Sequence, residues 1–165
     1  MLAKDLAGMT FADQLQRAFL ADDPHAEQRD IEHGHVQLVR QQYDAIARGD
    51  FEAILETVTD DIEFEIVSQT PLPFVHAAKG RAGLTAHLRK NFSQLDDQRP
   101  EILAAVAQGN LLAVFGIEHG RIRATGQPYA AHWAHLFTFR GGKVARLREF
   151  VDTGPLLGAA ATPAS

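Results

Sequence analysis

The stretch that decides the fold is AHWAHLFTFRGGKVARLREFVD, residues 131–152. Two runs of alternating side chains flank Gly141-Gly142, and a glycine pair between such runs is a strong signal of a two-residue β-hairpin turn. With the glycines in the turn, Arg140 lies opposite Lys143, and each step outward adds one cross-strand pair. Odd-numbered residues before the turn and even-numbered residues after it are therefore predicted to share one face.

That face has the composition of a site for an organic ligand. It is predicted to carry two large aromatic rings, an imidazole, a guanidinium and a carboxylate, which are Trp133, Phe150, His135, Arg148 and Asp152. Ligand pockets combine apolar walls with a few polar groups that orient the ligand. The predicted pairs Trp133–Phe150 and His135–Arg148 would place these side chains next to one another on that face.

Outward from the hairpin, the periodicity of the apolar residues separates helices from strands. Helices are expected over 10–21, over 30–48 or 35–48, after Asp50, and from Gly80 onward. Strands are expected over 61–67, 101–107, 110–119, 121–140 or 127–140, and 143–152. Helices followed by a meandering antiparallel sheet indicate an α+β fold, in which the helices cover one face of the sheet.

The composition sets limits on domain organisation and partners. A chain of 165 residues suits one domain, here with a helical extension over 1–29, a main domain over 30–153 and a flexible tail over 154–165. The net charge of -5, without clustered Lys or Arg, argues against a nucleic-acid surface. No signal or membrane-spanning segment is expected, so a cytoplasmic location is the default.

Metal chemistry is not expected either. The chain has no cysteine, which excludes disulfides and thiolate sites. Of the eight histidines, His33 and His35 point in different directions on a helix, and His132 and His135 project to opposite faces of a strand. Since no pair shows ligand spacing, neither a metal nor another cofactor is predicted.

Three stretches resemble, in their residues and in their order along the chain, the SnoaL-like group of the nuclear-transport-factor-2-like superfamily. They are YDAIARGDF at 43–51, KGRAGL at 79–84, and the closing segments TGQPY at 125–129 and FTFRGGKV at 137–144 with EFVD at 149–152. The resemblance covers about residues 30–153. It implies a cone-shaped domain whose curved antiparallel or mixed sheet wraps around N-terminal helices and encloses a pocket.

The resemblance also implies a partner and candidate site residues. A homodimer through the sheet is expected, with Leu136, Leu147 and Val151 on the far face. Polyketide cyclases of this kind use an Asp base assisted by a His, and Asp152 and His135 are the nearest matches. A carboxylate beside aromatic rings has a raised pKa, which suits proton transfer near neutral pH.

Two further residues, Tyr43 on the predicted second helix and Phe64 on the first strand, are added as ligand contacts. Two better-defined chemistries of the group are disfavoured. The position that holds the catalytic base in a ketosteroid isomerase is occupied here by Ile66. The position of its oxyanion-hole Tyr is near Gln42, one residue before Tyr43. The Arg-x-Asp pair of a limonene-epoxide hydrolase occurs only at residues 48–50, at a helix end.

Two hypotheses of function remain open, because the group includes both enzymes and non-catalytic modules. In the first, the pocket binds a small apolar organic molecule, and Asp152 with His135 performs an acid–base isomerisation, cyclisation or hydration. In the second, the domain is a non-catalytic ligand-binding or dimeric interaction module. Asp152 is then a turn residue before Gly154, and His135 and Arg148 form a polar pair at the mouth. The sequence leaves open whether the protein is an enzyme.

Overall fold

The computed structural model describes residues 26–68 and 76–161, so the helix predicted over 10–21 lies outside the described residues. The chain divides into two compact units, Met1–Ile31 and Glu32–Ser165. The described part of the first unit is the opening of one helix, whereas the second unit contains the sheet and the other helices. No helix among the described residues combines the length and apolar character needed to span a membrane.

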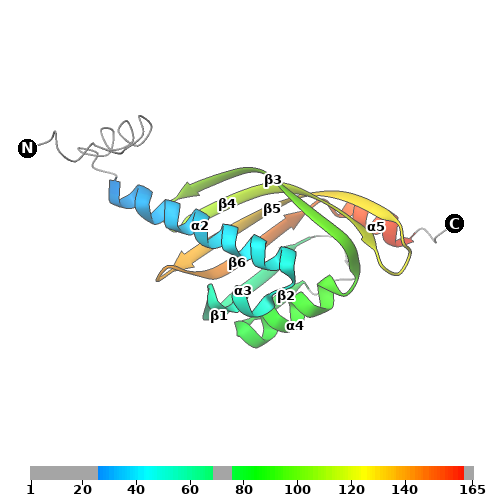
Figure 1. Ribbon diagram of the computed structural model, residues 1–165, viewed down its shortest axis with the longest axis horizontal. Helices are drawn as coiled ribbons and strands as arrows, with labels where there is room; N and C mark the ends of the chain where they lie inside the picture. The colour runs from blue at the N-terminus through cyan, green and yellow to red at the C-terminus, as the bar shows by residue number, and fades with distance from the viewer. Residues whose placement is uncertain (1–25, 69–75, 162–165) are drawn as a thin grey trace, which may run out of the picture. The chain divides into compact units, whose positions relative to one another are not determined.

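Four helices form in the described residues (Figure 1): α2 (Ala26–Arg48), α3 (Phe51–Glu56), α4 (Gly80–Phe92) and α5 (Thr153–Ala161). The α2 helix passes through Gly34 without a break, so it begins before the predicted start. It ends at Gly49, whose φ of 67° is readily adopted only by glycine. Asp50 then caps α3 as predicted, because its Oδ1 accepts a hydrogen bond from the Ala53 N–H at 3.1 Å.

The strands form one six-stranded sheet in the order β2-β1-β6-β5-β4-β3 (Figure 1). They are β1 (Val58–Val67), β2 (Ala77–Lys79), β3 (Leu95–Gln108), β4 (Leu111–Ile122), β5 (Pro128–Arg140) and β6 (Lys143–Val151). The sheet is mixed, because β1 and β6 are parallel and the other neighbouring strands are antiparallel. The predicted α+β class is confirmed. The short strand β2 lies in a segment for which the sequence predicts neither a helix nor a strand.

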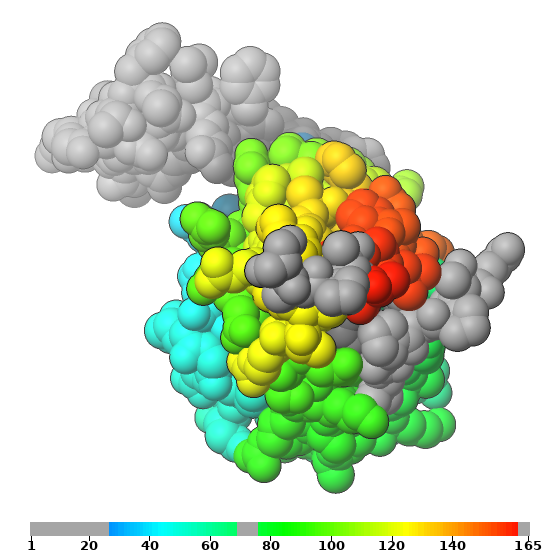
Figure 2. Space-filling model, turned by 90° about the vertical axis from the view of Figure 1, so that its right-hand side faces the viewer, coloured from blue at the N-terminus to red at the C-terminus, as the bar shows by residue number. Residues whose placement is uncertain are grey.

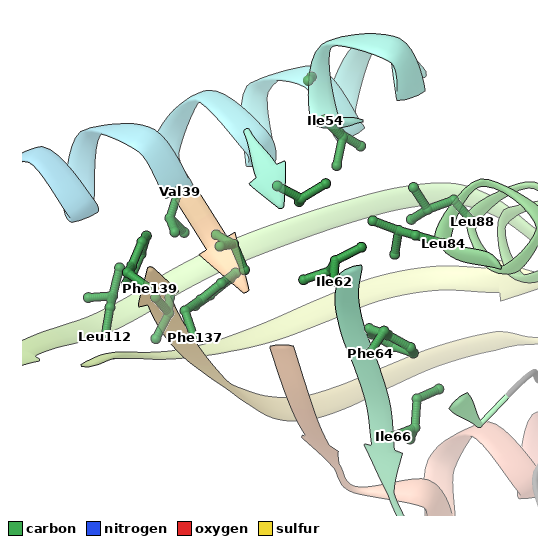
Figure 3. Close-up of a cluster of buried hydrophobic side chains, with 14 of the residues drawn as sticks. Val39, Ile54, Ile62, Phe64, Ile66, Leu84, Leu88, Leu112, Phe137 and Phe139 are labelled. Atoms are coloured by element: carbon green, nitrogen blue, oxygen red, sulfur yellow. The ribbon is translucent and has the colours of Figure 1, made fainter. Parts of the chain in front are cut away.

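The hydrophobic core lies between the helices and one face of the sheet. Val39 of α2, Ile54 of α3 and Leu88 of α4 point towards strand residues that include Ile62 and Phe137 (Figure 3). Phe137 is 2% exposed, and burying such a side chain contributes about 1.5–3 kcal/mol. This packing fixes which face of the sheet is interior.

The C-terminal segment differs from its prediction. The sequence analysis expects a flexible tail over 154–165, but residues up to Ala161 form α5. Leu156 and Ala159 of this helix are buried against the β4–β5 end of the sheet, and Thr125 Oγ1 donates to the Ala159 carbonyl at 2.8 Å. Figure 2 shows the red C-terminal helix beside yellow residues of the sheet. Tertiary packing stabilises a short helix that isolated Gly-, Ala- and Pro-rich sequence does not indicate.

The closing hairpin contains a β-bulge that the sequence analysis did not predict. Phe139 pairs with Val144 as expected, but the next pair is Thr138 with Arg146, so Ala145 is an extra residue. A shift of one residue moves every later side chain of the strand to the opposite face. The bulge therefore decides which half of β6 faces the interior.

Candidate functional site

A cavity of about 160 Å³ lies between the helices and the inner face of the sheet. Most of its wall is apolar. Its polar or titratable lining residues are Tyr43, His87, Asn91, Gln98, Glu118, Tyr129, His135 and Glu149. An engineered cavity of about 150 Å³ in another protein binds benzene, so this cavity has room for a molecule about the size of one ring.

Four of the seven predicted site residues line this cavity: Tyr43, Phe64, Trp133 and His135. They come from α2, β1 and β5, which the core packing brings together. The predicted residues of β6 do not join them. Because of the bulge, His135 lies opposite Glu149 instead of Arg148, and Trp133 lies opposite Val151.

The three remaining predicted residues lie outside the cavity lining. Phe150 is 39% exposed, and the Arg148 guanidinium lies 5.3 Å from the centre of its ring while Nε donates to Glu65 at 3.1 Å. Asp152 is exposed, and its Oδ1 accepts a hydrogen bond from the Gly154 N–H at 3.2 Å. The prediction that Asp152 faces the pocket is therefore wrong, and the turn interpretation describes its contacts.

The sequence contained a signal of the bulge that the prediction did not use. In a regular strand, the predicted face would turn both Arg146 and Arg148 into the cavity, and burying unpaired cations is costly. Val144 and Leu147 are both apolar, but their odd spacing prevents a regular strand from burying both. A bulge between them resolves both conflicts, and it places Glu149 inside.

Glu149 is the carboxylate that the cavity contains in place of Asp152. Its side chain is 26% exposed, and it lines the cavity beside the aromatic wall. Burial raises the pKa of Glu149 to about 7, and the negative charge of Glu118 acts in the same direction. Near neutral pH, Glu149 can therefore either accept or donate a proton.

His135 connects Glu149 to Tyr43. Its Nδ1 is 2.7 Å from the Tyr43 hydroxyl, and its Nε2 is 3.8 Å from Glu149 Oε2. Burial lowers the pKa of His135 to about 3, so the imidazole is neutral at physiological pH. Burial also raises the pKa of Tyr43, which keeps the phenol protonated. When Tyr43 donates to Nδ1, the imidazole proton resides on Nε2, the nitrogen nearer Glu149.

A second carboxylate, Glu118 on β4, has fixed partners in the same cavity. The Tyr129 hydroxyl donates to Glu118 Oε1 at 2.5 Å. Gln98 Nε2 lies 3.3 and 3.4 Å from the two carboxylate oxygens. Burial and the neighbouring Glu118 charge raise the pKa of Tyr129, so this phenol also keeps its proton. Sequence reasoning missed Glu118 because nothing in its own strand distinguishes it from a solvated Glu.

Two glycines of β4 make room for the aromatic wall. A Cβ added at Gly116 would lie 2.2 Å from the Trp133 ring, and one added at Gly120 would lie 2.7 Å from the Tyr129 hydroxyl. The two rings therefore occupy space that any other residue type would fill. The glycines let the rings lie close to β4 and keep the cavity open.

The structure also shows where the two residues at ketosteroid-isomerase positions, Ile66 and Gln42, lie. Ile66, at the position of the base, lines the cavity as an apolar residue. Gln42 is buried and donates to Thr57 Oγ1 at 2.5 Å, so it is Tyr43 that reaches the cavity from α2. Within residues 26–68 and 76–161, no group of three or more His, Asp or Glu side chains is arranged to hold a metal ion.

The mixed sheet, the helices on its inner face and the enclosed cavity define a domain of the nuclear-transport-factor-2-like class. A family model described as SnoaL-like domain matches residues 39–147. An NTF2-like protein from Burkholderia xenovorans LB400 is 31% identical, with a TM-score of 0.66 over 78% of this chain and 96% of that chain. The chain belongs to the SnoaL-like domain family, which confirms the resemblance.

Other solved structures share the fold at lower identity. A putative SnoaL-like polyketide cyclase from Jannaschia sp. CCS1 is 21% identical, with a TM-score of 0.71 over 81% of this chain and 96% of that one. A putative polyketide cyclase from Xanthomonas campestris pv. campestris is 20% identical, with a TM-score of 0.65 over 79% and 99%. No curated protein matches this chain.

Proposed function

We propose that this protein is an acid–base enzyme that moves a proton on a small, largely apolar, ring-sized substrate. The reaction classes are isomerisation, cyclisation or hydration. One observation carries the proposal. The Glu149 carboxyl lies in an aromatic-walled cavity, its pKa is raised to about 7, and a neutral imidazole lies 3.8 Å away. Glu149 takes the role that the sequence analysis assigns to Asp152.

The chemistry follows from the protonation states of the three groups. Ionised Glu149 removes a proton from a substrate carbon next to a carbonyl, and the C–H electron pair moves to form an enolate. Neutral His135 stabilises the enolate oxygen by donating a hydrogen bond through Nε2–H and keeps its proton, while Tyr43 holds the imidazole through Nδ1. Protonated Glu149 then returns the proton to another carbon, which restores the carboxylate. A positioned acid–base group contributes about 10²–10⁴-fold to such a rate.

The experiment follows the conversion of 3-cyclohexenone, a ring-sized β,γ-unsaturated ketone, into its conjugated isomer in D₂O. Wild-type protein should accelerate the conversion, and Glu149→Gln should slow it by about 100-fold or more. Glu101→Gln is the matched control, because Glu101 is exposed on the edge strand β3. A wild-type rate no greater than that of Glu149→Gln would show that Glu149 is not an acid–base catalyst.

A second candidate function, a dimeric interaction module, rests on the outer face of the sheet. Phe115 and Phe150 are 44% and 39% exposed, and both pair with Ala134 between them, so they form one row across three strands. We propose that a second copy of the chain covers this row. Leu147 and Val151, which the sequence analysis places on this face, line the cavity instead.

The dimer proposal is tested by sedimentation velocity. Wild-type protein should sediment as a dimer, and Phe115→Asp should sediment as a monomer, because a charge in an apolar interface is costly. Lys143→Asp on the exposed hairpin end is the control and should not change the mass. A monomeric wild-type protein at high concentration would refute this proposal and leave the cavity chemistry untouched.

A further inference from the structure

The described Asp, Glu, Lys and Arg side chains that line the cavity are all of one sign. Among its described lining residues are two carboxylates, Glu118 and Glu149, and neither Lys nor Arg. The imidazole of His135 is neutral at physiological pH because burial disfavours its charged form. Burial raises the pKa of Glu149, and the charge of Glu118 adds to this effect, so the two carboxylates lie close enough to interact. The second imidazole of the wall, His87, accepts a hydrogen bond from the Asn91 amide through Nδ1 at 3.1 Å, as a neutral ring does. The described wall therefore carries two carboxylates and no Lys or Arg to balance them.

Glu118 is held as a fixed acceptor. Tyr129 reaches it from β5 and Gln98 from β3, so the carboxylate is fixed from both neighbouring strands. A carboxylate has about four acceptor sites, and three donor contacts leave capacity for one more. A ligand N–H in the cavity can use that capacity without displacing a protein group.

The surrounding rings favour the same kind of ligand. Trp133, Tyr43 and Tyr129 all line the cavity, and the faces of aromatic rings attract cations. Gly116 and Gly120 seat two of these rings against β4, so their positions are set by the backbone. The volume of about 160 Å³ limits the ligand to about one ring with a short substituent.

We propose that the cavity binds a ring-sized organic cation, a protonated amine on an aromatic or alicyclic ring, with Glu118 as its ionic partner. Carboxylates and phosphates are excluded, because they would meet a fixed negative charge and no described cation. This inference rests on the proposed function of the same cavity and adds that the ring of the carbonyl substrate carries a protonated amine.

The test uses three probes of nearly equal shape: benzylammonium, benzyl alcohol and benzoate. Trp133 is the single tryptophan of the chain and lines the cavity, so its fluorescence reports binding. Near neutral pH, benzylammonium should bind about tenfold tighter than benzyl alcohol, a ratio within the range of cation–π and ionic contacts. Benzoate should show no saturable binding. Equal affinity for benzoate and benzylammonium would overturn the inference.

Glu118→Gln tests the assigned partner, since it removes the charge and keeps the shape. The affinity for benzylammonium should fall to that for benzyl alcohol, and unchanged binding of benzyl alcohol would show that the cavity is intact. Glu101→Gln, on the exposed edge strand, should keep the tenfold preference. A preference that survives in Glu118→Gln would refute the role of Glu118. If Glu118→Gln also loses benzyl alcohol, Glu118 holds the cavity wall and the assignment fails.

The two proposals fail separately, because binding of the probes does not require turnover. Proton transfer through Glu149 without a preference for benzylammonium would refute only the inference about charge. A preference for benzylammonium without proton transfer would refute only the acid–base function.

Discussion

Replacing Glu149 by Gln should stabilise the folded protein at about pH 8 and change its stability little at about pH 5. Burial raises the pKa of this carboxyl from 4.5 to about 7 in the folded state. Between these values, the folded state keeps a proton that the unfolded state has released, so stability falls as the pH rises. Gln has nearly the shape of the protonated carboxyl and does not ionise, so the variant lacks this loss.

The magnitude follows from the two pKa values. They differ by about 2.5, and a difference of one corresponds to about 1.36 kcal/mol, which gives an upper bound of about 3.4 kcal/mol. Because 26% of the side chain is exposed, solvent reduces this figure. We expect the advantage of the variant to grow by about 2 kcal/mol between pH 5 and pH 8.

His135 acts in the opposite direction at lower pH. Its pKa is lowered from 6.5 to about 3, so the unfolded state binds a proton that the folded state excludes, and stability falls as the pH drops through that range. This contribution is present in both proteins and cancels to first order when they are compared. The difference between wild type and Glu149→Gln therefore isolates the carboxyl.

The assay is urea denaturation followed by Trp133 fluorescence at several pH values from about 5 to 8. Glu101→Gln, exposed on β3, is the control, and it should change the free energy of unfolding little. An effect of Glu149→Gln that is equal at pH 5 and pH 8 would show that the folded carboxyl titrates normally. The assignment of Glu149 as the proton carrier would then lose its basis.

Three further substitutions have defined outcomes. Tyr43→Phe removes the hydroxyl bonded to the cavity imidazole and should cost about 1 kcal/mol in urea denaturation; an unchanged stability would contradict this contact. Gly116→Ala should displace the Trp133 ring into the cavity, which should shift the Trp133 fluorescence and weaken the binding of benzyl alcohol. Gly34→Ala, whose methyl group would meet open space, should change neither the fluorescence nor the binding. Asp152→Asn should leave proton transfer unchanged, because this residue is exposed; loss of turnover would return catalysis to Asp152.

Local sequence determined the order of the elements and the position of the closing turn. Gly141 and Gly142 both have positive φ, 58° and 73°, as a two-residue hairpin turn requires. The first two pairs beyond the glycines, Arg140 with Lys143 and Phe139 with Val144, also form as expected. These features depend on neighbours in the chain, so the sequence carries their signal directly.

The helices that could be predicted from the sequence are those with local signals. The Asp50 cap precedes α3, and apolar residues at helical spacing mark α2 and α4. The α5 helix was missed because its stability comes from Leu156 and Ala159 packing on distant strands. Local propensity contributes little to so short a helix.

The spacing of Val144 and Leu147 is a local sign of a bulge in β6, but the tertiary structure decided that it forms and so which carboxylate enters the cavity. The bulge at Ala145 lies where β6 meets β1, and Val144 N–H donates to the Thr57 carbonyl there at 3.0 Å. The pairing of β1 with β6 also changes register in this region. Thr57 is far from Ala145 in the chain, so the hairpin sequence does not contain this contact.

The alternation of side chains along a strand has a period of two, so sequence shows which residues share a face but not which face is interior after a bulge. Trp133 and His135, before the turn, line the cavity for this reason, and the residues predicted for the same face after the turn lie on the opposite face. The sequence thus determined the fold and half of the cavity. Packing between distant strands decided that Glu149, and not Asp152, lies inside it.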